Sequence, residues 1–332
     1  MNRYGTILVA GLGSAGQRHV RNLRSLTQSR FIFYRTGKAT LATEELEDGA
    51  PSYSDLEGAL SERPDLAIIA NPTAFHMPVA LAAAKAGCHL FIEKPLSHSR
   101  EGSAELKSIT ESKGLITMIG CQFRFHPLLL ALKEGLDRGR IGAVLGARAD
   151  WGEYLPDWHP WEDHRKSYAA RPELGGGALL TLIHPLDYMY WFFGDVKSVV
   201  ARARKVDRLE TSVPDDWADV LLEFKSGVLA QVHVDLLQRP SVHSLTVWGE
   251  LGKACWDYHT GRLEWTDSES GVEVERLPED FDRNDLFLAE MRHFLECAAQ
   301  KRPSRVPLED GIAVLEIALR AREAAMEAAA ND

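Results

Sequence analysis

Short, nearly all-apolar runs alternate with longer amphipathic segments over the first 120 residues. Apolar runs of this length are typical of strands that are buried on both faces of a parallel sheet. The runs are residues 6–10, 30–34, 66–70, 88–92 and 115–120. Helices are predicted between them, at about 14–27, from after Thr73 to about Ala86, and at about 99–113. The pattern predicts an α/β domain over residues 1–122, with a doubly wound parallel sheet.

The pattern changes after residue 122. Alternating apolar and polar residues dominate from about Val196 to Val274, which predicts antiparallel strands of one large sheet. Helices are predicted at about 127–138, 178–193, 285–299 and 309–328, with a strand at about 143–151. Residues 123–332 are therefore expected to form an α+β domain with a large, mostly antiparallel, open-faced sheet.

Three glycines with the spacing G-x-G-x-x-G follow the first strand directly. Gly11 allows a tight turn, Gly13 lets a pyrophosphate approach the backbone, and Gly16 lets helix and strand pack closely. The helix that begins with Ser14 and Ala15 points its positive end at the phosphates. The motif predicts a Rossmann dinucleotide site at these five residues. The alternative is a glycine-rich turn without a ligand.

The end of the second strand bears on which dinucleotide binds. An acidic residue there accepts hydrogen bonds from the adenine ribose of NAD, but this chain has no acidic residue before Glu44. The side chains that follow the strand are Arg35, Thr36 and Lys38, and they suit a 2′-phosphate. They favour NADP over NAD. The competing interpretation is that they are solvated loop charges.

Polar side chains also follow the third strand, at the edge where open parallel sheets bind ligands. Asn71 and Thr73 are candidates for contacts with the nicotinamide half of the cofactor. His76 either contacts the same ligand or only packs and caps the next helix. The third strand therefore predicts a continuation of the cofactor site.

Glu93 and Lys94 follow the fourth strand, and both are assigned to the predicted cofactor site. Pro95 restricts Lys94 to extended conformations, which fixes the direction of its cationic side chain. A lysine held there can bond to a hydroxyl, or to the alkoxide that develops at a hydride-transfer carbon. The alternative is an ordinary surface lysine.

The composition limits the partners of this chain. With 332 residues, 45% of them hydrophobic, and a net charge of −10, the chain is large enough for two domains and unsuited to nucleic acid or anionic membranes. Its four cysteines lie far apart with no C-x-x-C pair, so neither a disulfide framework nor a metal site is expected. No apolar run has the length of a membrane helix. A cytoplasmic location is expected.

An aromatic and charged stretch follows the strand at about 143–151. Aromatic faces suit the C–H faces of a sugar ring, and cations suit a carboxylate or phosphate. The predicted substrate-binding residues are Tyr154, Trp158, Trp161, Arg165, Lys166 and Tyr168. The alternative is that the tryptophans only anchor this loop on the core.

The predicted helix 178–193 contains a polar stripe, and Pro185 is expected to kink it. Thr181, His184 and Asp187 are spaced i, i+3, i+6, so they share one face of an otherwise apolar helix. Buried polar side chains must find partners or perform a function. His184 is therefore a candidate for catalysis and substrate binding. The alternative is a core histidine whose hydrogen bonds are satisfied.

The ordered set of motifs resembles the glucose–fructose oxidoreductase, inositol dehydrogenase and rhizopine-catabolism (Gfo/Idh/MocA) family over nearly the whole chain. The set consists of the glycine fingerprint, Asn71-Pro72-Thr73, Glu93-Lys94-Pro95, Arg124-Phe125-His126-Pro127 and Gly139-Arg140-Ile141-Gly142. The resemblance implies an NAD(P)-dependent oxidoreductase that acts on a secondary alcohol or ketone of a sugar, sugar acid or cyclitol. It also implies a homo-dimer or tetramer formed through the sheet of the second domain.

The resemblance further implies that Lys94 and His184 share proton transfer at one substrate oxygen. Where relatives carry an aspartate three residues before this histidine, the chain has Thr181, which orients a hydroxyl or water but is not an ionised base. Asp187 is expected to be structural. Two alternatives stay open: an NAD-dependent glycosidase on the same fold, and a catalytically inactive dinucleotide sensor.

Overall fold

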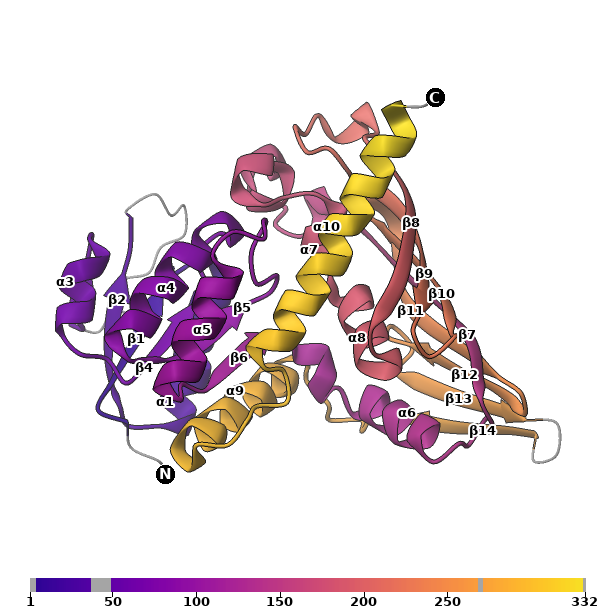
Figure 1. Ribbon diagram of the computed structural model, residues 1–332, viewed down its shortest axis with the longest axis horizontal. Helices are drawn as coiled ribbons and strands as arrows, with labels where there is room; N and C mark the ends of the chain where they lie inside the picture. The colour runs from indigo at the N-terminus through magenta and orange to yellow at the C-terminus, as the bar shows by residue number, and fades with distance from the viewer. Residues whose placement is uncertain (1–3, 37–48, 268–270, 331–332) are drawn as a thin grey trace. The chain divides into compact units, whose positions relative to one another are not determined.

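The computed structural model describes residues 4–36, 49–267 and 271–330. The chain divides into two compact units. Unit 1 consists of Met1–Gln122 and Arg283–Leu315, and unit 2 of Phe123–Asp282 and Glu316–Asp332. Figure 1 shows the elements of each unit.

Unit 1 is built on a six-stranded, wholly parallel sheet in the order β3-β2-β1-β4-β5-β6. The strands are β1 (Thr6–Ala10), β2 (Arg30–Tyr34), β3 (Ser52–Tyr53), β4 (Leu66–Ile69), β5 (His89–Glu93) and β6 (Thr117–Gly120). The helices are α1 (Ser14–Leu26), α3 (Leu56–Ser61), α4 (His76–Ala86), α5 (Ser103–Lys113) and α9 (Arg283–Gln300). The doubly wound sheet predicted from the apolar runs is confirmed.

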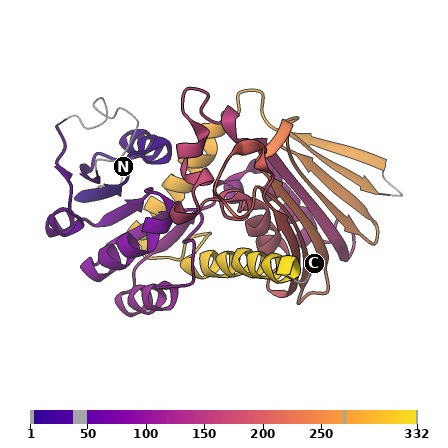
Figure 2. The same cartoon turned by 90° about the horizontal axis from the view of Figure 1, so that it is seen from above.

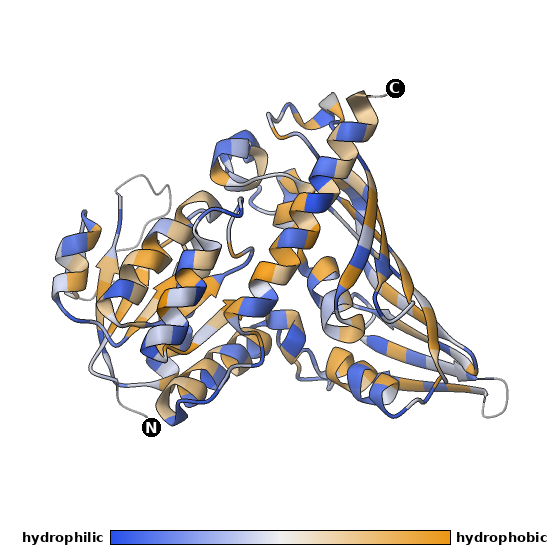
Figure 3. Cartoon of the chain, in the orientation of Figure 1, coloured by the Kyte–Doolittle hydropathy of each residue, from blue (hydrophilic) through white to orange (hydrophobic). Residues whose placement is uncertain are grey.

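The central strands of unit 1 are buried on both faces, as their sequences predict. Ile7, Leu8, Val9 and Ala10 of β1 are fully buried, and all four residues of β4 are buried as well. Figure 3 shows these strands as a mostly hydrophobic layer. Burial of this kind stabilises a domain by roughly 25 cal/mol for each Å² of apolar surface removed from water.

Unit 1 also contains residues 283–315, which the sequence pattern placed in the second domain. Helix α9 packs on α1 and on β6, and its buried face includes Leu286, Met291 and Phe294. The backbone N–H of Ile119 in β6 donates to the carbonyl of Val306, 2.9 Å away. The apolar face of this helix thus completes the core of unit 1, which hydrophobic periodicity alone does not specify.

Unit 2 is built on an eight-stranded sheet in the order β14-β13-β12-β11-β7-β10-β9-β8. Its strands are β7 (Val144–Tyr154), β8 (Val196–Arg204), β9 (Trp217–Phe224), β10 (Leu229–Asp235), β11 (Leu237–Gly249), β12 (Gly252–Asp257), β13 (Arg262–Asp267) and β14 (Gly271–Arg276). Every pair is antiparallel except β7 and β10. The predicted large, mostly antiparallel sheet is confirmed.

Helices cover one face of the unit 2 sheet. These are α6 (Pro127–Asp137), α7 (Ala178–Thr181) and α8 (His184–Phe193), which contact strands of this sheet. The long helix α10 (Leu308–Ala330) begins in unit 1 and ends in unit 2. Figures 1 and 2 show α6, α7 and α8 on the same side of the sheet, while no described helix lies on the opposite face.

The single helix predicted over 178–193 is instead two helices, which corrects the sequence analysis. The chain leaves the helical conformation at Leu182 (φ −100°, ψ 44°), and α8 starts afresh at His184 with Pro185 in its first turn. Proline lacks the N–H that the helix interior needs, but a first turn does not use it. Pro185 therefore starts α8 rather than kinking a longer helix, and Thr181 and His184 do not share one continuous helix face.

No helix in the described part of the chain combines the length and the apolar character needed to span a bilayer.

Candidate functional site

The glycine turn after β1 has the geometry that its spacing predicts. Gly11 has φ +91°, and a Cβ there would lie 2.6 Å from the backbone nitrogen of Asn71. A Cβ on Gly16 would lie 2.0 Å from the carbonyl oxygen of Gly11, so only glycine allows α1 to approach the turn this closely. The tight turn and the close packing of helix and strand are thus present.

The same turn fits a dinucleotide. A Cβ on Gly13 would meet nothing within 4 Å, so this position faces open space. Gly13 precedes α1 and no side chain caps the first turn, which leaves backbone N–H groups of Ser14 and Ala15 for another acceptor. Uncapped N–H groups beside an open glycine are what a pyrophosphate requires.

The predicted 2′-phosphate residues lie after β2. Arg35 is half-buried, and its backbone N–H donates to the carbonyl of Tyr53 in β3 at 2.9 Å. Thr36 is exposed. Lys38 lies outside the described residues. The backbone of Arg35 is thus fixed by β3, a strand that the sequence analysis missed because it is only two residues long.

The end of β4 places Asn71, Thr73 and His76 close together. Asn71 Nδ2 donates to the carbonyl of Phe75 (3.2 Å), while its Oδ1 is buried without a hydrogen-bond partner among the described residues. Thr73 is buried at the start of a short helical turn. The two ring nitrogens of His76 lie against the carbonyls of Pro95 and Asn71, which agrees with the packing alternative for this histidine.

The end of β5 carries Glu93 and Lys94. Glu93 is mostly buried, and its Oε1 accepts a hydrogen bond from Nε2 of His19 on α1 at 2.6 Å. Burial raises the pKa of Glu93, but the hydrogen bond and charge of His19 and the charge of Lys94 lower it further, so that the net shift is downward. Lys94 is half-buried. The carboxylate beside Lys94 is therefore ionised at neutral pH.

In unit 2, His184 lies in a cluster of aromatic rings that the sequence analysis did not identify. Its ring stacks on Trp151 (centroids 5.4 Å apart) and meets the edge of Phe123 at 4.9 Å. His243 stacks on the same Trp151 at 4.2 Å, with the rings nearly parallel. His243 occupies an inward position of β11, on the same buried face as Leu245 and Val247. A histidine in such an inward register is the signal in the sequence that could have indicated this cluster.

Thr181 ends α7, whose start is fixed by the preceding glycines. A Cβ on Gly176 would lie 2.5 Å from the carbonyl oxygen of Tyr168, and Gly177 has φ +104°. Asp215 accepts a hydrogen bond from the backbone N–H of Leu179 at 2.8 Å and thereby caps this short helix. Thr181 is fully buried. The glycine run thus allows the backbone to pack closely before α7, and this packing fixes the start of the helix that carries Thr181.

Asp187 forms a buried ion pair with Arg124. Arg124 Nη2 lies 2.7 Å from Asp187 Oδ1, and Nε donates to both carboxylate oxygens. Both side chains are only 1% exposed. The structural role expected of Asp187 agrees with this geometry, because the pair fastens the turn before α6 to α8.

The predicted substrate-binding residues differ in exposure and in their partners. Trp161 is 73% exposed, and Lys166 is also exposed. Arg165 is held by Asp163 (2.8 Å) and Glu210 (3.0 Å), and this arginine lowers the pKa of Asp163 to about 2. These contacts lie within the loops of unit 2, and the role of Arg165 in substrate binding stays a prediction.

Three further residues of that stretch differ in their surroundings. Tyr154 lies beneath the guanidinium of Arg239, whose Cζ is 3.9 Å from the ring centroid. Trp158 has a buried Nε1 with no hydrogen-bond partner among the described residues. Tyr168 is half-buried in a short helical turn. Their role in substrate binding stays a prediction.

A third buried histidine of unit 2, His126, lies among Phe123, Trp256 and Phe281. It is fully buried, and neither ring nitrogen has a hydrogen-bond partner among the described residues. Burial lowers the pKa of His126 to about 4. The ring is therefore neutral at pH 7.

Nowhere in the described part of the chain do three His, Cys, Asp or Glu side chains gather closely enough to bind a metal ion.

A six-stranded parallel sheet with an uncapped glycine turn, joined to a unit with a large antiparallel sheet, defines a dinucleotide-binding oxidoreductase of two domains. Residues 6–121 match the profile described as "Oxidoreductase family, NAD-binding Rossmann fold", and residues 129–255 match the "GFO/IDH/MocA C-terminal domain". The chain belongs to the GFO/IDH/MocA family of oxidoreductases.

Relatives and solved structures agree with this assignment. An uncharacterized oxidoreductase of Synechocystis sp. is 29% identical over 264 residues, covering 74% of this chain and 70% of the relative. The scyllo-inositol 2-dehydrogenase (NAD(+)) of Bacillus subtilis is 26% identical over 330 residues, covering 94% of this chain and 92% of the relative. Levoglucosan dehydrogenase, solved with NADH and levoglucosan, has the same fold, with a TM-score of 0.86, 18% identity and 98% of each chain covered.

Proposed function

We propose that this protein transfers a hydride between a nicotinamide dinucleotide and a secondary alcohol or ketone of a sugar, sugar acid or cyclitol. The observation that carries the proposal is Lys94 at the end of β5, in a unit whose glycine turn fits a dinucleotide. The relatives named as cyclitol and anhydrosugar dehydrogenases support the substrate class. The bound cofactor supplies the hydride chemistry itself.

In this proposal three side chains act on the reacting oxygen of the substrate. The Lys94 ammonium bonds to this oxygen and stabilises its developing negative charge. The His184 imidazole accepts the hydroxyl proton in oxidation and returns it in reduction, a contribution worth roughly 10²–10⁴ in rate. Thr181, with a hydroxyl in place of a carboxylate, orients a hydroxyl or a water.

The remaining candidates bind rather than react. Gly11, Gly13, Ser14, Ala15 and Gly16 receive the pyrophosphate, and the side chains after β2 and β4 receive the two ends of the dinucleotide. The predicted substrate contacts between Tyr154 and Tyr168 hold the part of the substrate remote from the reacting carbon.

A panel of polyols, cyclitols and keto-sugars tests the proposal. Oxidation of NAD(P)H or reduction of NAD(P)⁺ is followed at 340 nm, and turnover is expected with at least one member. Dinucleotide binding without turnover on the whole panel would instead indicate a sensor. A dinucleotide that stays bound, with no net redox change while a glycosidic bond breaks, would indicate a glycosidase.

NADP is the preferred cofactor in this proposal. Arg35 and Thr36 follow β2, where a 2′-phosphate would be received, and no acidic residue stands nearby in the sequence to repel it. We expect NADPH to bind more tightly than NADH to the parent protein. Arg35→Asp is expected to weaken NADPH binding by about 10–100-fold, because a charge-assisted bond is replaced by a repulsion.

Fluorescence titration with both dinucleotides measures this change. Arg63→Asp, an exposed position on the turn after α3, is the matched control and should leave the ratio of the two affinities unchanged. Tighter binding of NADH by the parent protein would contradict the preference for NADP.

The open face of the unit 2 sheet is proposed to pair with a second copy of this chain. Val200 of β8 and Leu221 of β9 lie directly opposite each other on this face. Further exposed apolar side chains of the sheet are Leu229, Trp248, Val272 and Val274. Monomeric proteins rarely expose so many apolar side chains on one surface. Association through this face buries them, which supports a homo-dimer or tetramer.

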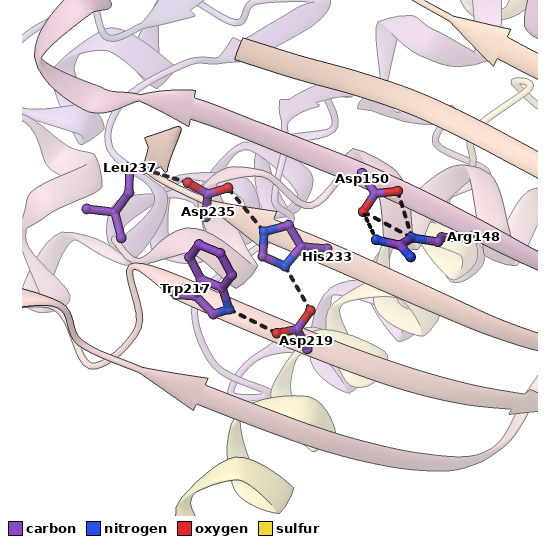
Figure 4. A network of polar contacts seen from close by, with 7 residues as sticks. All are labelled: Arg148, Asp150, Trp217, Asp219, His233, Asp235 and Leu237. Atoms are coloured by element: carbon purple, nitrogen blue, oxygen red, sulfur yellow. Dashed lines mark hydrogen bonds and ion pairs between the residues drawn. The ribbon is translucent and has the colours of Figure 1, made fainter. Parts of the chain in front are cut away.

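A polar network on the same face fixes its shape (Figure 4). His233 Nδ1 lies 2.8 Å from Asp219 Oδ1, and its Nε2 lies 3.1 Å from Asp235 Oδ2. Arg148 makes a two-pronged contact with Asp150 on β7. Burial lowers the pKa of His233, but the hydrogen bonds to Asp235 and Asp219 raise it further, for a net upward shift. The face thus presents both signs of charge beside exposed apolar side chains, which suits a self-complementary contact.

Leu221→Glu tests this contact. Two like charges are introduced into a symmetric interface, so the dissociation constant of the oligomer is expected to rise by at least about 100-fold. Sedimentation velocity reports the oligomeric state. Met326→Glu changes an apolar residue of α10 that is more exposed than Leu221, and it should leave the oligomeric state unchanged. A parent protein that is monomeric at micromolar concentrations would remove the proposal.

A reducing, cytoplasmic compartment is the proposed location. No disulfide joins any of the four cysteines, all of which lie in the described ranges, and Cys88, Cys121 and Cys297 are buried. Burial raises the pKa of the Cys88 thiol to about 12, so this side chain is unreactive at neutral pH.

A further inference from the structure

Two buried histidines hold the residues on either side of Lys94. His19 of α1 contacts Glu93, and His76 at the start of α4 contacts Pro95. All of these residues belong to unit 1. The chain segment that carries Lys94 is therefore fastened to two different helices.

The contact on the first side runs through a carboxylate. His19 is fully buried, one turn after Gly16, and donates from Nε2 to Glu93 Oε1 at 2.6 Å. The other carboxylate oxygen of Glu93 accepts the backbone N–H of Lys94 at 3.2 Å. Glu93 thus links the imidazole of His19 to the backbone of Lys94.

The charges around Glu93 keep its carboxylate ionised, which strengthens the hydrogen bonds that it accepts from His19 and Lys94. Arg18 and Lys94 lower the pKa of Glu93, in addition to His19. The other nearby carboxyl is Glu290 of α9, which is fully buried and whose pKa is raised well above its ordinary value by burial. The pKa of Glu290 is thus raised while that of Glu93 is lowered, so Glu93 is the carboxyl that ionises first. Hydrogen bonds to an ionised acceptor are roughly twice as strong as neutral ones.

The contact on the second side runs through the backbone. His76 Nδ1 lies 2.9 Å from the carbonyl oxygen of Pro95, and Nε2 lies 2.8 Å from that of Asn71. Carbonyl oxygens only accept hydrogen bonds, and a neutral imidazole carries one N–H. Burial lowers the pKa of His76, more than the two carbonyls and Glu93 raise it, so the ring is neutral at pH 7. It donates to one carbonyl at a time.

We propose that His19 and His76 are positioning residues for Lys94, which they fix from both sides by holding Glu93 and the carbonyl of Pro95. The inference rests on the proposed role of Lys94 at the reacting oxygen. A lysine side chain is flexible and loses about 2 kcal/mol of rotamer entropy when it is ordered. A misplacement of 1 Å can cost about 100-fold in rate. Fixing the backbone of Lys94 limits the misplacement, because only the side chain is then left to order.

Amide substitutions separate this role from simple space filling. A glutamine places its N–H₂ near the position of histidine Nε2, and an asparagine near that of Nδ1. His19→Gln therefore keeps the donor to Glu93, while His19→Asn loses it. At His76 the order is reversed: His76→Asn keeps the donor to Pro95, while His76→Gln donates toward Asn71. Each pair has the same chemistry, so the two members control for polarity and folding.

The expected result is a split within each pair. His19→Gln and His76→Asn should keep at least about tenfold more kcat than His19→Asn and His76→Gln. The dissociation constant for NADPH should differ by less than about threefold within the His19 pair, because the glycine turn is untouched. The rate of reductive methylation of the Lys94 amine, followed by mass spectrometry without cofactor or substrate, should differ within each pair as well. Methylation of Lys85 on the exposed part of α4 is the internal reference.

Equal kcat and equal Lys94 methylation within both pairs would overturn the inference, because the rings would then only fill space. Lys94→Ala separates this failure from failure of the proposed function. An inactive Lys94→Ala with no split within the pairs refutes the positioning role alone. A fully active Lys94→Ala refutes the proposed catalytic role of Lys94, whatever the histidine variants do.

Discussion

Lys94→Ala is expected to lower kcat by about 10²–10³ while the dissociation constant for the dinucleotide changes little. The size follows from the loss of one preorganised donor to the charge that develops on the reacting oxygen. Binding is spared because the pyrophosphate is received at the glycine turn after β1, on another strand. Steady-state kinetics with the substrate found in the panel, together with fluorescence titration of NADPH, measures both quantities. Lys85→Ala, an exposed lysine of α4, is the control.

His184→Ala is expected to lower kcat by about 10²–10⁴ through loss of the proton acceptor. Because both groups serve one oxygen in the proposal, the double variant with Lys94→Ala should lose less than the product of the two single losses. His259→Ala, on an exposed turn, is the control. Normal turnover in either single variant would remove the role assigned to that residue.

The largest expected effect on stability belongs to Arg124. Arg124→Met is expected to lower the free energy of unfolding by about 3–5 kcal/mol, because Asp187 would be left as an unpaired charge in the core. Chemical denaturation followed by tryptophan fluorescence measures the change. Arg124 also lies 5.8 Å from the ring of Trp191, which adds packing to the loss.

Two further variants test the cause of this loss. Arg138→Met breaks an exposed pair with Glu134 on the surface of α6 and should cost about 0.3–0.5 kcal/mol. Arg124→Met combined with Asp187→Leu removes both buried charges and should recover part of the stability. A double variant that is less stable than Arg124→Met alone would show that shape, not charge, governs this site.

The apolar runs of unit 1 located its strands because each run is buried on both faces and so carries no polar residue. The same apolar runs predicted where each strand ends, which is where Asn71 and Lys94 lie. Parallel strands present their carboxyl ends at one edge of the sheet. The glycine spacing predicted the close approach of Gly16 to Gly11 for a steric reason that the structure reproduces. The local sequence pattern was sufficient to predict a feature wherever that feature depends on neighbouring residues alone, as for a buried strand or a tight glycine turn.

Prediction from the sequence failed where contacts between distant segments decide the structure. Leu182 breaks a helix that its apolar neighbours predict, because the glycines before α7 and Pro185 in α8 fix two separate helix starts. His243 and Trp151 come from different strands, so their stacking follows from the register of β11 against β7. The partners of Arg165 likewise come from a loop 45 residues away as well as from its own turn. Contacts between such distant segments leave no periodic pattern in a single sequence, so they could not be predicted from it.

The buried ring of His126 makes the stability of the fold decline as the pH falls. In the unfolded chain a histidine takes up a proton near pH 6.5, whereas in the folded protein the pKa is about 4. Between these values the unfolded state binds more protons, so each step toward acid shifts the equilibrium to it. The stability that this residue provides is complete above about pH 6.5 and declines by about 3 kcal/mol as the pH falls to 4. Mild acidification therefore destabilises this protein through the buried aromatic pocket that holds His126.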